Sequence, residues 1–146
     1  MPDLTSPVLS PCTCLRVRKL ARRVSQIYDQ ALEGYDLTIT QFGLLNQLRT
    51  QDGITIGALA ERLVMDPTTL TRNLRPLERR GMMVFAPDPA DRRSRALHLT
   101  EKGRQTFREA HPGWQAAQAL VERRLGGTET KALNAALDQL LERLAP

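Results

Sequence analysis

Residues 54–81 read ITIGALAERLVMDPTTLTRNLRPLERRG, and this stretch decides the fold. In its first part, residues 56–63 carry apolar side chains at helical spacing, which predicts a short amphipathic helix. Asp66-Pro67 then marks a second helix start, because aspartate caps free backbone N–H groups and proline fits the first helical position. Gly81 is the expected terminator of that helix. Two helices joined by so short a break predict a helix–turn–helix.

The second helix of this pair has one apolar face and one basic face. Successive side chains rotate by about 100°, so its leucines form a single buried stripe. The remaining faces carry threonine and arginine, namely Thr68, Thr69, Thr71, Arg72, Arg75 and Arg79. Arginine binds guanine edges and threonine contacts thymine methyls or phosphates, so these faces suit the major groove of DNA. For an isolated helix, the alternative is an ordinary solvated basic face.

Residues 82–99 change in character from helical to extended. Two short runs of strand-forming residues flank a polar turn, which predicts a β-hairpin, the wing. Near the tip lie three arginines and two aspartates, namely Arg92, Arg93, Arg95, Asp88 and Asp91. We expect Asp88 and Asp91 to structure the wing. Asp91 would fix the turn, by accepting backbone N–H groups or by pairing with an arginine, so that one arginine can enter the minor groove. The alternative is a surface salt bridge of little energetic value.

The rest of the chain is predicted to be helical. A first helix spans about residues 15–32 and a second one starts with Thr40 as its N-cap. After the hairpin, Thr100 caps a long helix that His111-Pro112-Gly113 is expected to interrupt, and Thr128 caps the last one. The predicted organisation is a loose arm at 1–11, a helical dimerisation region at 12–36 and 100–146, and a winged helix–turn–helix lobe at 37–99. Apolar stripes on the flanking helices suggest the dimer interface.

Length and charge set the outer limits of these interpretations. The chain has 146 residues, about one domain, and a formal net charge of +5, which favours a polyanionic partner such as nucleic acid or a membrane surface. A soluble protein that is merely basic is the alternative. The sequence contains no apolar run long enough to predict a transmembrane helix, and no signal-peptide pattern, so we expect a cytoplasmic protein that does not insert into a membrane.

Together these motifs resemble the MarR family of bacterial transcriptional regulators. The resemblance rests on LTITQFGLLNQL at 37–48, on the helix–turn–helix stretch, on DPADRRSRALHLTEKGR at 88–104 and on the closing apolar helix. It implies a homodimeric winged-helix regulator of a pseudo-palindromic DNA operator, with a small-molecule effector bound between the dimerisation region and the DNA-binding lobe. By position, it also implies that Thr68, Thr69, Thr71, Arg72 and Arg75 read the groove and that Arg92 or Arg93 is the wing finger.

No feature of the sequence predicts an enzyme. Nucleophile, phosphate-loop, zinc-protease and paired-carboxylate motifs are all missing, and no cofactor is expected. We interpret His98 as a surface or half-buried strand residue and His111 as a helix-end residue. The alternative function is a helical module that binds protein rather than DNA, against which the arginine-lined helix and wing argue.

The two cysteines, Cys12 and Cys14, lie together at the predicted start of the first helix, ahead of five basic residues between positions 16 and 23. Three interpretations stay open. The thiols are inert, or they sense oxidants because a helix N-terminus and nearby arginines favour a reactive thiolate, or they bind a metal across a dimer. One residue between them does not allow an unstrained disulfide, and two thiolates are too few for a closed zinc site.

Overall fold

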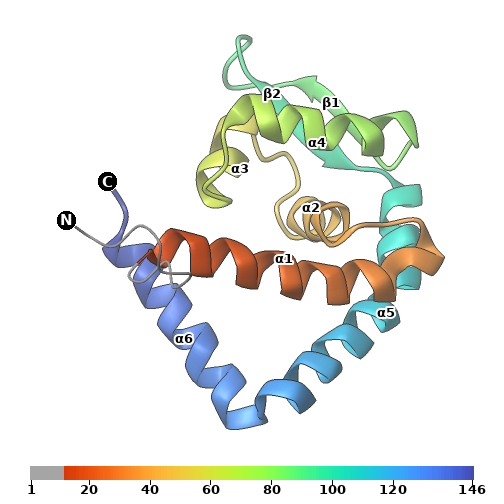
Figure 1. Ribbon diagram of the computed structural model, residues 1–146. Helices are drawn as coiled ribbons and strands as arrows, with labels where there is room; N and C mark the ends of the chain where they lie inside the picture. The colour runs from red at the N-terminus through yellow and green to blue at the C-terminus, as the bar shows by residue number, and fades with distance from the viewer. Residues whose placement is uncertain (1–11) are drawn as a thin grey trace, which may run out of the picture.

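The structure, a computed structural model, describes residues 12–146, and helices dominate it (Figure 1). In chain order the elements are α1 (Thr13–Leu32), a 3₁₀ turn (Glu33–Tyr35), α2 (Ile39–Thr50), α3 (Ile56–Arg62), α4 (Pro67–Arg79), β1 (Met83–Pro87), β2 (Arg95–Leu99), α5 (Glu101–Leu125) and α6 (Gly127–Arg143). The predicted fold class, mainly helical with a small β-hairpin wing, is confirmed. The arm predicted at 1–11 lies outside the described residues.

The elements divide into an upper lobe and a helical half (Figure 1). The lobe contains α2, α3, α4 and the hairpin, in which β1 pairs antiparallel with β2. Below it, α1 runs across the view while α5 descends from the lobe and α6 returns, so that the three helices outline a triangle. The α5 helix thus belongs to both parts of the molecule.

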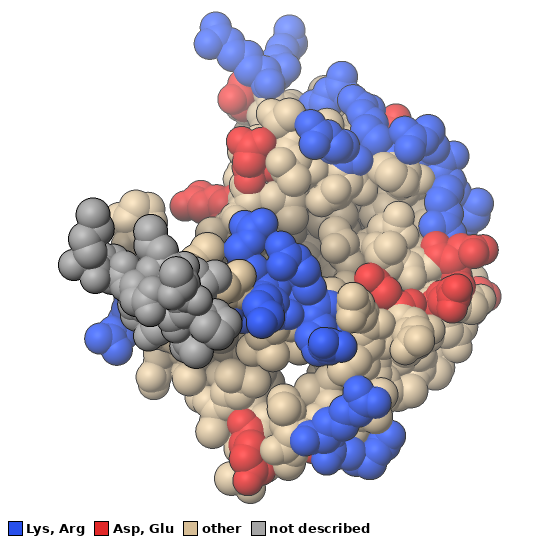
Figure 2. Space-filling model, viewed as in Figure 1, with Lys and Arg blue, Asp and Glu red and all other residues tan. Residues whose placement is uncertain are grey.

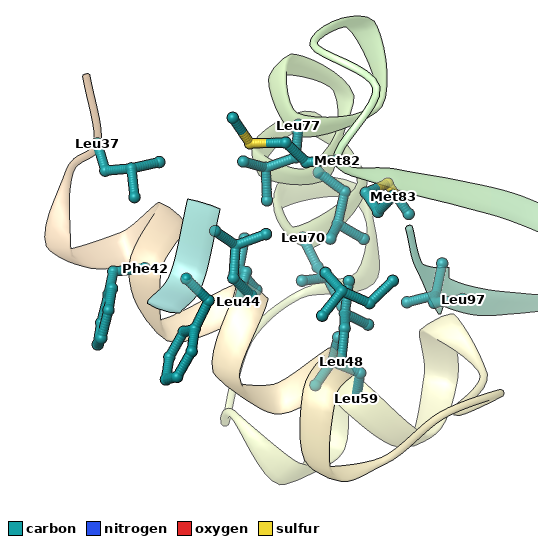
Figure 3. Packing of buried hydrophobic residues seen from close by; sticks show 14 of the residues in the cluster. Leu37, Phe42, Leu44, Leu48, Leu59, Leu70, Leu77, Met82, Met83 and Leu97 are labelled. Carbon is teal, nitrogen blue, oxygen red and sulfur yellow. The ribbon is translucent and has the colours of Figure 1, made fainter. Parts of the chain in front are cut away.

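One hydrophobic core holds the lobe together (Figure 3). Its largest fully buried side chains are leucines from α2, α3, α4 and the end of α1, with Met83 and Leu97 from the hairpin. The leucine stripe predicted for α4 lies inside this core, with Leu70, Leu74 and Leu77 all buried. Burying one leucine side chain contributes roughly 1.5–3 kcal/mol, so packing places α4 against the hairpin.

The ends of three helices are closed by the same backbone motif. After α4, the N–H of Gly81 donates to the carbonyl of Glu78 (2.9 Å) and that of Met82 to the carbonyl of Leu77 (2.9 Å), with Gly81 at a φ of +73°. This is the Schellman ending, in which glycine adopts the left-handed conformation at little cost. The same pattern closes α3 with Val64 in the glycine position, at a φ of 52°, and the 3₁₀ turn after α1 with Asp36 at 54°.

Val64 is strained because a β-branched residue is disfavoured in the left-handed region. Its side chain is 79% exposed, so it gains little from packing in return. We therefore expect Val64→Gly to raise the free energy of unfolding of the DNA-free protein by about 0.5–1 kcal/mol. This is the backbone strain that glycine relieves, reduced by the larger conformational entropy of glycine in the unfolded chain. Val84→Gly is the matched control, because Val84 is an exposed valine in regular strand β1 and its replacement should destabilise. A lower melting temperature for Val64→Gly would contradict the prediction.

Two helices have their N-caps two residues before the predicted positions. The N-cap of α2 is Thr38 and not Thr40, because Thr38 and Gln41 form a reciprocal capping box (3.1 and 3.2 Å) and Asp29 accepts the N–H of Ile39 (2.7 Å). Helix α6 begins at Gly127, so the predicted cap Thr128 lies inside its first turn. There Gly126, at a φ of +95°, turns the chain directly from α5 into α6.

The predicted interruption of the long helix is also wrong, because α5 continues through Pro112 and Gly113. Proline removes one backbone N–H from the helix, a cost of about 3 kcal/mol that packing must offset. Side chains on both sides of the proline are buried, Phe107 and Ala110 before it and Ala117 and Val121 after it. Gly113 lets α5 approach α1 closely, since a Cβ there would lie 2.8 Å from the carbonyl oxygen of Ala31. In α4, likewise, the helix continues through Pro76 to Arg79.

Candidate DNA interface

The start of α4 is built as the sequence predicts. Asp66 is the N-cap, with its Oδ2 accepting the N–H of Thr69 (3.1 Å), and Pro67 occupies the first turn. Thr68 and Thr69 are exposed. Since Pro67 has no N–H and the N–H of Thr69 is bonded to Asp66, the N–H of Thr68 is the group that this first turn offers to a phosphate.

The basic faces of α4 divide into free and engaged side chains. Arg72 and Arg79 are exposed, and no acidic partner is seen for either within residues 12–146. Thr71 is half-buried, and its hydroxyl donates to the carbonyl of Pro67 (2.9 Å). Arg75 pairs with Glu78 (2.8 Å), and its guanidinium lies over the ring of Phe85 in β1. Arg72 is therefore the predicted groove residue with the most freedom to reach a base.

The wing turn is held by its two aspartates. Asp88 Oδ1 accepts the N–H of Ala90 (3.1 Å), and Asp91 Oδ1 accepts that of Arg93 (2.9 Å), the two-residue spacing of an Asx turn. The carbonyl of Asp91 also accepts the N–H of Ser94 (3.0 Å). These contacts support the predicted structuring role of Asp88 and Asp91. They leave Arg92 and Arg93 exposed at the tip.

Positive charge gathers over the same part of the molecule. Figure 2 shows Lys and Arg over the upper lobe, along α4 and at the hairpin tip, and a second group over α1. The α1 group consists of exposed side chains from Arg16, Arg18, Lys19, Arg22 and Arg23. The structure thus brings the predicted DNA-contacting residues of α4 and the wing into one basic surface, and it places a further basic group in the helical half.

The cysteines lie at the start of α1, in the helical half. Cys12 is the N-cap, with its Sγ accepting the N–H of Leu15 (3.4 Å), and its carbonyl accepts from Arg16 (3.2 Å). Both thiols are free and exposed. Within residues 12–146, no three or more His, Cys, Asp or Glu side chains come together in a way that would hold a metal ion.

A pocket lies between α2 and α5, where the lobe meets the helical half, and sequence reasoning missed the residues that line it. Its volume is about 550 Å³, and it is lined by Ile39, Phe42, Gly43, Asn46, Arg49, Phe107, Arg108, His111 and Trp114. The rings of Phe42 and Phe107 stack at 4.8 Å, and Arg49 lies 4.8 Å from the Phe107 centroid. The signal was present in the spacing of Phe107, His111 and Trp114, which share one helix face. A predicted helix break at His111 separates these three residues, so their common face was not apparent from the sequence.

The two histidines have different surroundings. His111 is not a helix-end residue, because α5 is continuous there, and its ring lies 5.8 Å from that of Phe107 and 5.7 Å from that of Trp114. His98 is a partly exposed residue of β2, as predicted, with Nδ1 3.0 Å from Oδ1 of Asp52. Neither histidine stands in a catalytic arrangement with a nucleophile in the described part of the chain.

The joint between α1 and α5 contains a buried hydroxyl. Burial raises the pKa of Tyr28, and the negative charge of Glu122 raises it further. The neutral hydroxyl donates to Oε1 of Gln118, whose amide in turn donates to Glu122 (3.0 Å). Tyr28, Ala117 and Val121 form a second, smaller core. This core attaches α1 to the lower half of α5.

Comparisons with known proteins agree with this geometry. A family model described as the MarR family matches residues 37–94, which include α2, the helix–turn–helix and most of the wing. An uncharacterized HTH-type transcriptional regulator from Bacillus cereus is 30% identical over 105 residues, 72% of this chain and 69% of that protein. The relatives are transcriptional regulators and not enzymes.

Two solved structures of high similarity contain DNA. The M. tuberculosis transcriptional regulator MosR in complex with DNA has a TM-score of 0.78 and 35% identity, over 92% of this chain and 99% of that one. The transcriptional repressor CouR bound to a 23-mer DNA duplex has a TM-score of 0.82 and 27% identity, over 95% of this chain and 99% of that one. No helix among residues 12–146 has the length and apolar character needed to cross a membrane.

Proposed function

Because the chain belongs to the MarR family and is a DNA-binding transcriptional regulator, we propose that it acts as a homodimeric repressor on a pseudo-palindromic operator. The observation that carries the proposal is the exposed Thr and Arg surface of α4 beside an arginine-tipped wing. A two-fold dimer presents two such surfaces to two half-sites, which predicts the palindrome. The similarity to a DNA-bound repressor supports repression over activation. A regulator of transcription must reach the chromosome, so we place it in the cytoplasm.

The helical half is proposed as the dimerisation region, comprising 12–36 and 100–146, with 37–99 as the DNA-binding lobe. Its main support is α6, where Thr130 is the one side chain buried against the described part of the chain. The rest of this helix exposes an apolar stripe, with Leu140 47% and Leu144 80% exposed. A contiguous apolar stripe on a soluble protein marks an interaction surface, and a second copy brings an identical stripe to cover it.

Within the lobe, each predicted DNA contact is assigned a role. Thr68, Thr69 and Arg72 are proposed to contact bases and phosphates of the major groove, together with Thr71 through its methyl group. Arg92 or Arg93 is proposed to enter the minor groove, because a narrow groove concentrates negative potential. Arg75 and Arg95 lie between these two sets, at the joint between helix and wing.

Selection of bound duplexes from a random DNA pool tests this function directly. We expect a motif with two inverted half-sites about one helical turn apart and an affinity that falls steeply with salt. Arg72→Ala should cost about 1–3 kcal/mol and relax the preference at one position of each half-site. Lys131→Ala, which removes an exposed positive charge from the side of α6 away from its leucine stripe, is the control and should bind as wild type does. Failure to enrich any motif, with weak binding to all duplexes, would favour the protein-binding module instead.

The pocket between α2 and α5 is proposed as the effector site. Aromatic walls with Arg49, Arg108 and His111 at the lining suit a flat apolar molecule that carries an acidic group. Trp114 is the single tryptophan of the chain and lines the pocket, so its fluorescence reports binding. Benzoate should quench it more strongly than uncharged benzyl alcohol, and equal or absent quenching by the two would argue against an acidic effector.

Oxidation of the cysteines is the second proposed route of release. Peroxide converts an exposed thiolate to sulfenic acid, and at Cys12 this would disturb the cap of α1. We expect peroxide to lower the operator affinity of wild type and to have less effect on Cys14→Ser. Cys12→Ser keeps a capping oxygen and separates the two thiols. An unchanged response in both variants, or no response in wild type, would leave the thiols inert. Zinc bound per dimer after purification without chelator tests the metal alternative.

A further inference from the structure

The ring of Phe85 in β1 lies close to two arginine side chains from different elements. The guanidinium carbon of Arg75, from α4, is 4.7 Å from the ring centroid, and that of Arg95, from β2, is 5.7 Å from it. Both distances lie in the range where the negative face of an aromatic ring attracts a cation. Helix α4, the proposed recognition helix, and the wing therefore meet at one aromatic side chain.

Packing holds that ring in place. Phe85 pairs with Leu97 across the hairpin and Arg95 pairs with Pro87, so Phe85 and Arg95 occupy the same face of the two strands. Leu97 is fully buried, while Phe85 packs against the edge of the core and is half-buried. The ring thus sits where the hairpin leaves the core, and it offers a fixed platform to exposed arginines that would otherwise be mobile.

The charges at this joint are not balanced. Arg75 has an acidic neighbour in Glu78, at 2.8 Å, but no carboxylate pairs with Arg95 in the part of the chain that the structure describes. Each guanidinium has five N–H donors, and one group of Arg75, Nη1, donates to Glu78, so further donors of both side chains stay available. Two guanidiniums held at one ring lie close enough together to reach the oxygens of the same phosphate group.

We propose that Arg75 and Arg95, held by Phe85, form a clamp for a backbone phosphate of DNA at the joint between the recognition helix and the wing. The clamp rests on the proposed function, since it needs α4 in the major groove. It changes the role expected for Arg75, whose guanidinium is held toward the hairpin by Phe85. Phosphate contacts set the position of a protein on the duplex without specifying sequence. Base reading then falls to Thr68, Thr69 and Arg72, and Phe85 is a positioning residue.

A coupled set of variants tests the role of Phe85. Affinity for the selected operator is measured by fluorescence anisotropy for Phe85→Leu, alone and combined with Arg75→Ala and Arg95→Ala. We expect a loss of about threefold to tenfold from Phe85→Leu in wild type and no further loss in the double-arginine variant. Phe85→Tyr keeps an aromatic ring, so this variant should bind the operator as tightly as wild type does. An equal loss in both backgrounds would overturn the proposal, because Phe85 would then act on the fold and not through the arginines.

Salt dependence and a base-pair scan test the phosphate contact itself, without any change to Phe85. Arg95→Ala should reduce the salt slope of log affinity by about one for each phosphate that is no longer neutralised, about two for a symmetric dimer. Arg75→Ala should weaken binding equally to every single-base-pair variant of the operator, whereas Arg72→Ala should relax one position. If Arg75→Ala relaxes one position, Arg75 reads a base and the clamp is wrong. If wild type binds all base-pair variants of the operator equally, the proposed function itself is contradicted, and not only the clamp.

Discussion

Gly103→Ala is expected to lower the free energy of unfolding by about 3 kcal/mol or more, the upper range for overpacking a dense core. A Cβ at this position would overlap the carbonyl oxygen of Met82 and would lie 2.6 Å from Cδ1 of Leu99. A flexible side chain could move aside, but the carbonyl of Met82 is fixed because it accepts the N–H of Thr100 (3.0 Å). The first turn of α5 would have to leave the hairpin.

Urea unfolding followed by circular dichroism measures this effect, at one protein concentration because association contributes to stability. Gly57→Ala is the matched control. Gly57 is an exposed helical glycine with no neighbouring atom within 4 Å of an added Cβ, so alanine should be neutral or stabilise by up to about 1 kcal/mol. A Gly103→Ala protein as stable as wild type would contradict the close packing of α5 on the hairpin.

Leu141→Asp is expected to dissociate the dimer and to reduce operator affinity by about a hundredfold or more, because a monomer reaches only one half-site. Leu141 is 60% exposed in the protomer, where a polar replacement should change stability by no more than about 0.5 kcal/mol. In an α6 interface the same aspartate would place a charge in an apolar contact, which is strongly unfavourable. The size of the effect therefore distinguishes an interface from a solvent-facing helix.

Analytical ultracentrifugation gives the mass of each variant, and anisotropy gives its operator affinity. Gln139→Asp introduces the same charge about 200° around α6 from Leu141, so it controls for charge and helix propensity. We expect the Gln139→Asp protein to remain dimeric and to bind DNA. If Leu141→Asp also sediments as a dimer with unchanged affinity, α6 is not the contact between protomers and the proposed dimerisation region must be revised.

Local chemistry made the centre of the fold predictable from sequence. Asp66, Pro67 and Thr100 mark helix starts by capping rules that depend on a few neighbouring residues, and the structure places all three as expected. The leucine stripe of α4 and the alternation of the hairpin also follow from short-range periodicity. These features fixed the helix–turn–helix, the wing and the candidate DNA-contacting residues.

The errors and omissions arise where contacts between distant segments decide the outcome. Gly113 and Pro112 read as a break because propensity is local, whereas the close approach of α5 to α1 keeps the helix intact. The pocket between α2 and α5 depends on that continuity, because Phe107, His111 and Trp114 line it from one face of α5. Val64 adopts a left-handed conformation that valine disfavours. The contacts at Phe85 involve Arg75 and Arg95, each of which is ten residues away along the chain. Pattern reading within one element cannot detect these pairings.

The continuity of α5 also has a mechanical consequence. At 1.5 Å per residue, its 25 residues form a rod about 37 Å long, comparable with the spacing of about 34 Å between half-sites one turn apart. Its upper end carries Phe107 in the core of the lobe, and its lower end carries Val121 against α1. A rigid rod acts as a lever, so a tilt of about 5° at one end displaces the other by about 3 Å over that length. In the proposed dimer, small changes at the pocket between α2 and α5 or at the start of α1 would thereby be enlarged into a change in the distance between the two copies of α4.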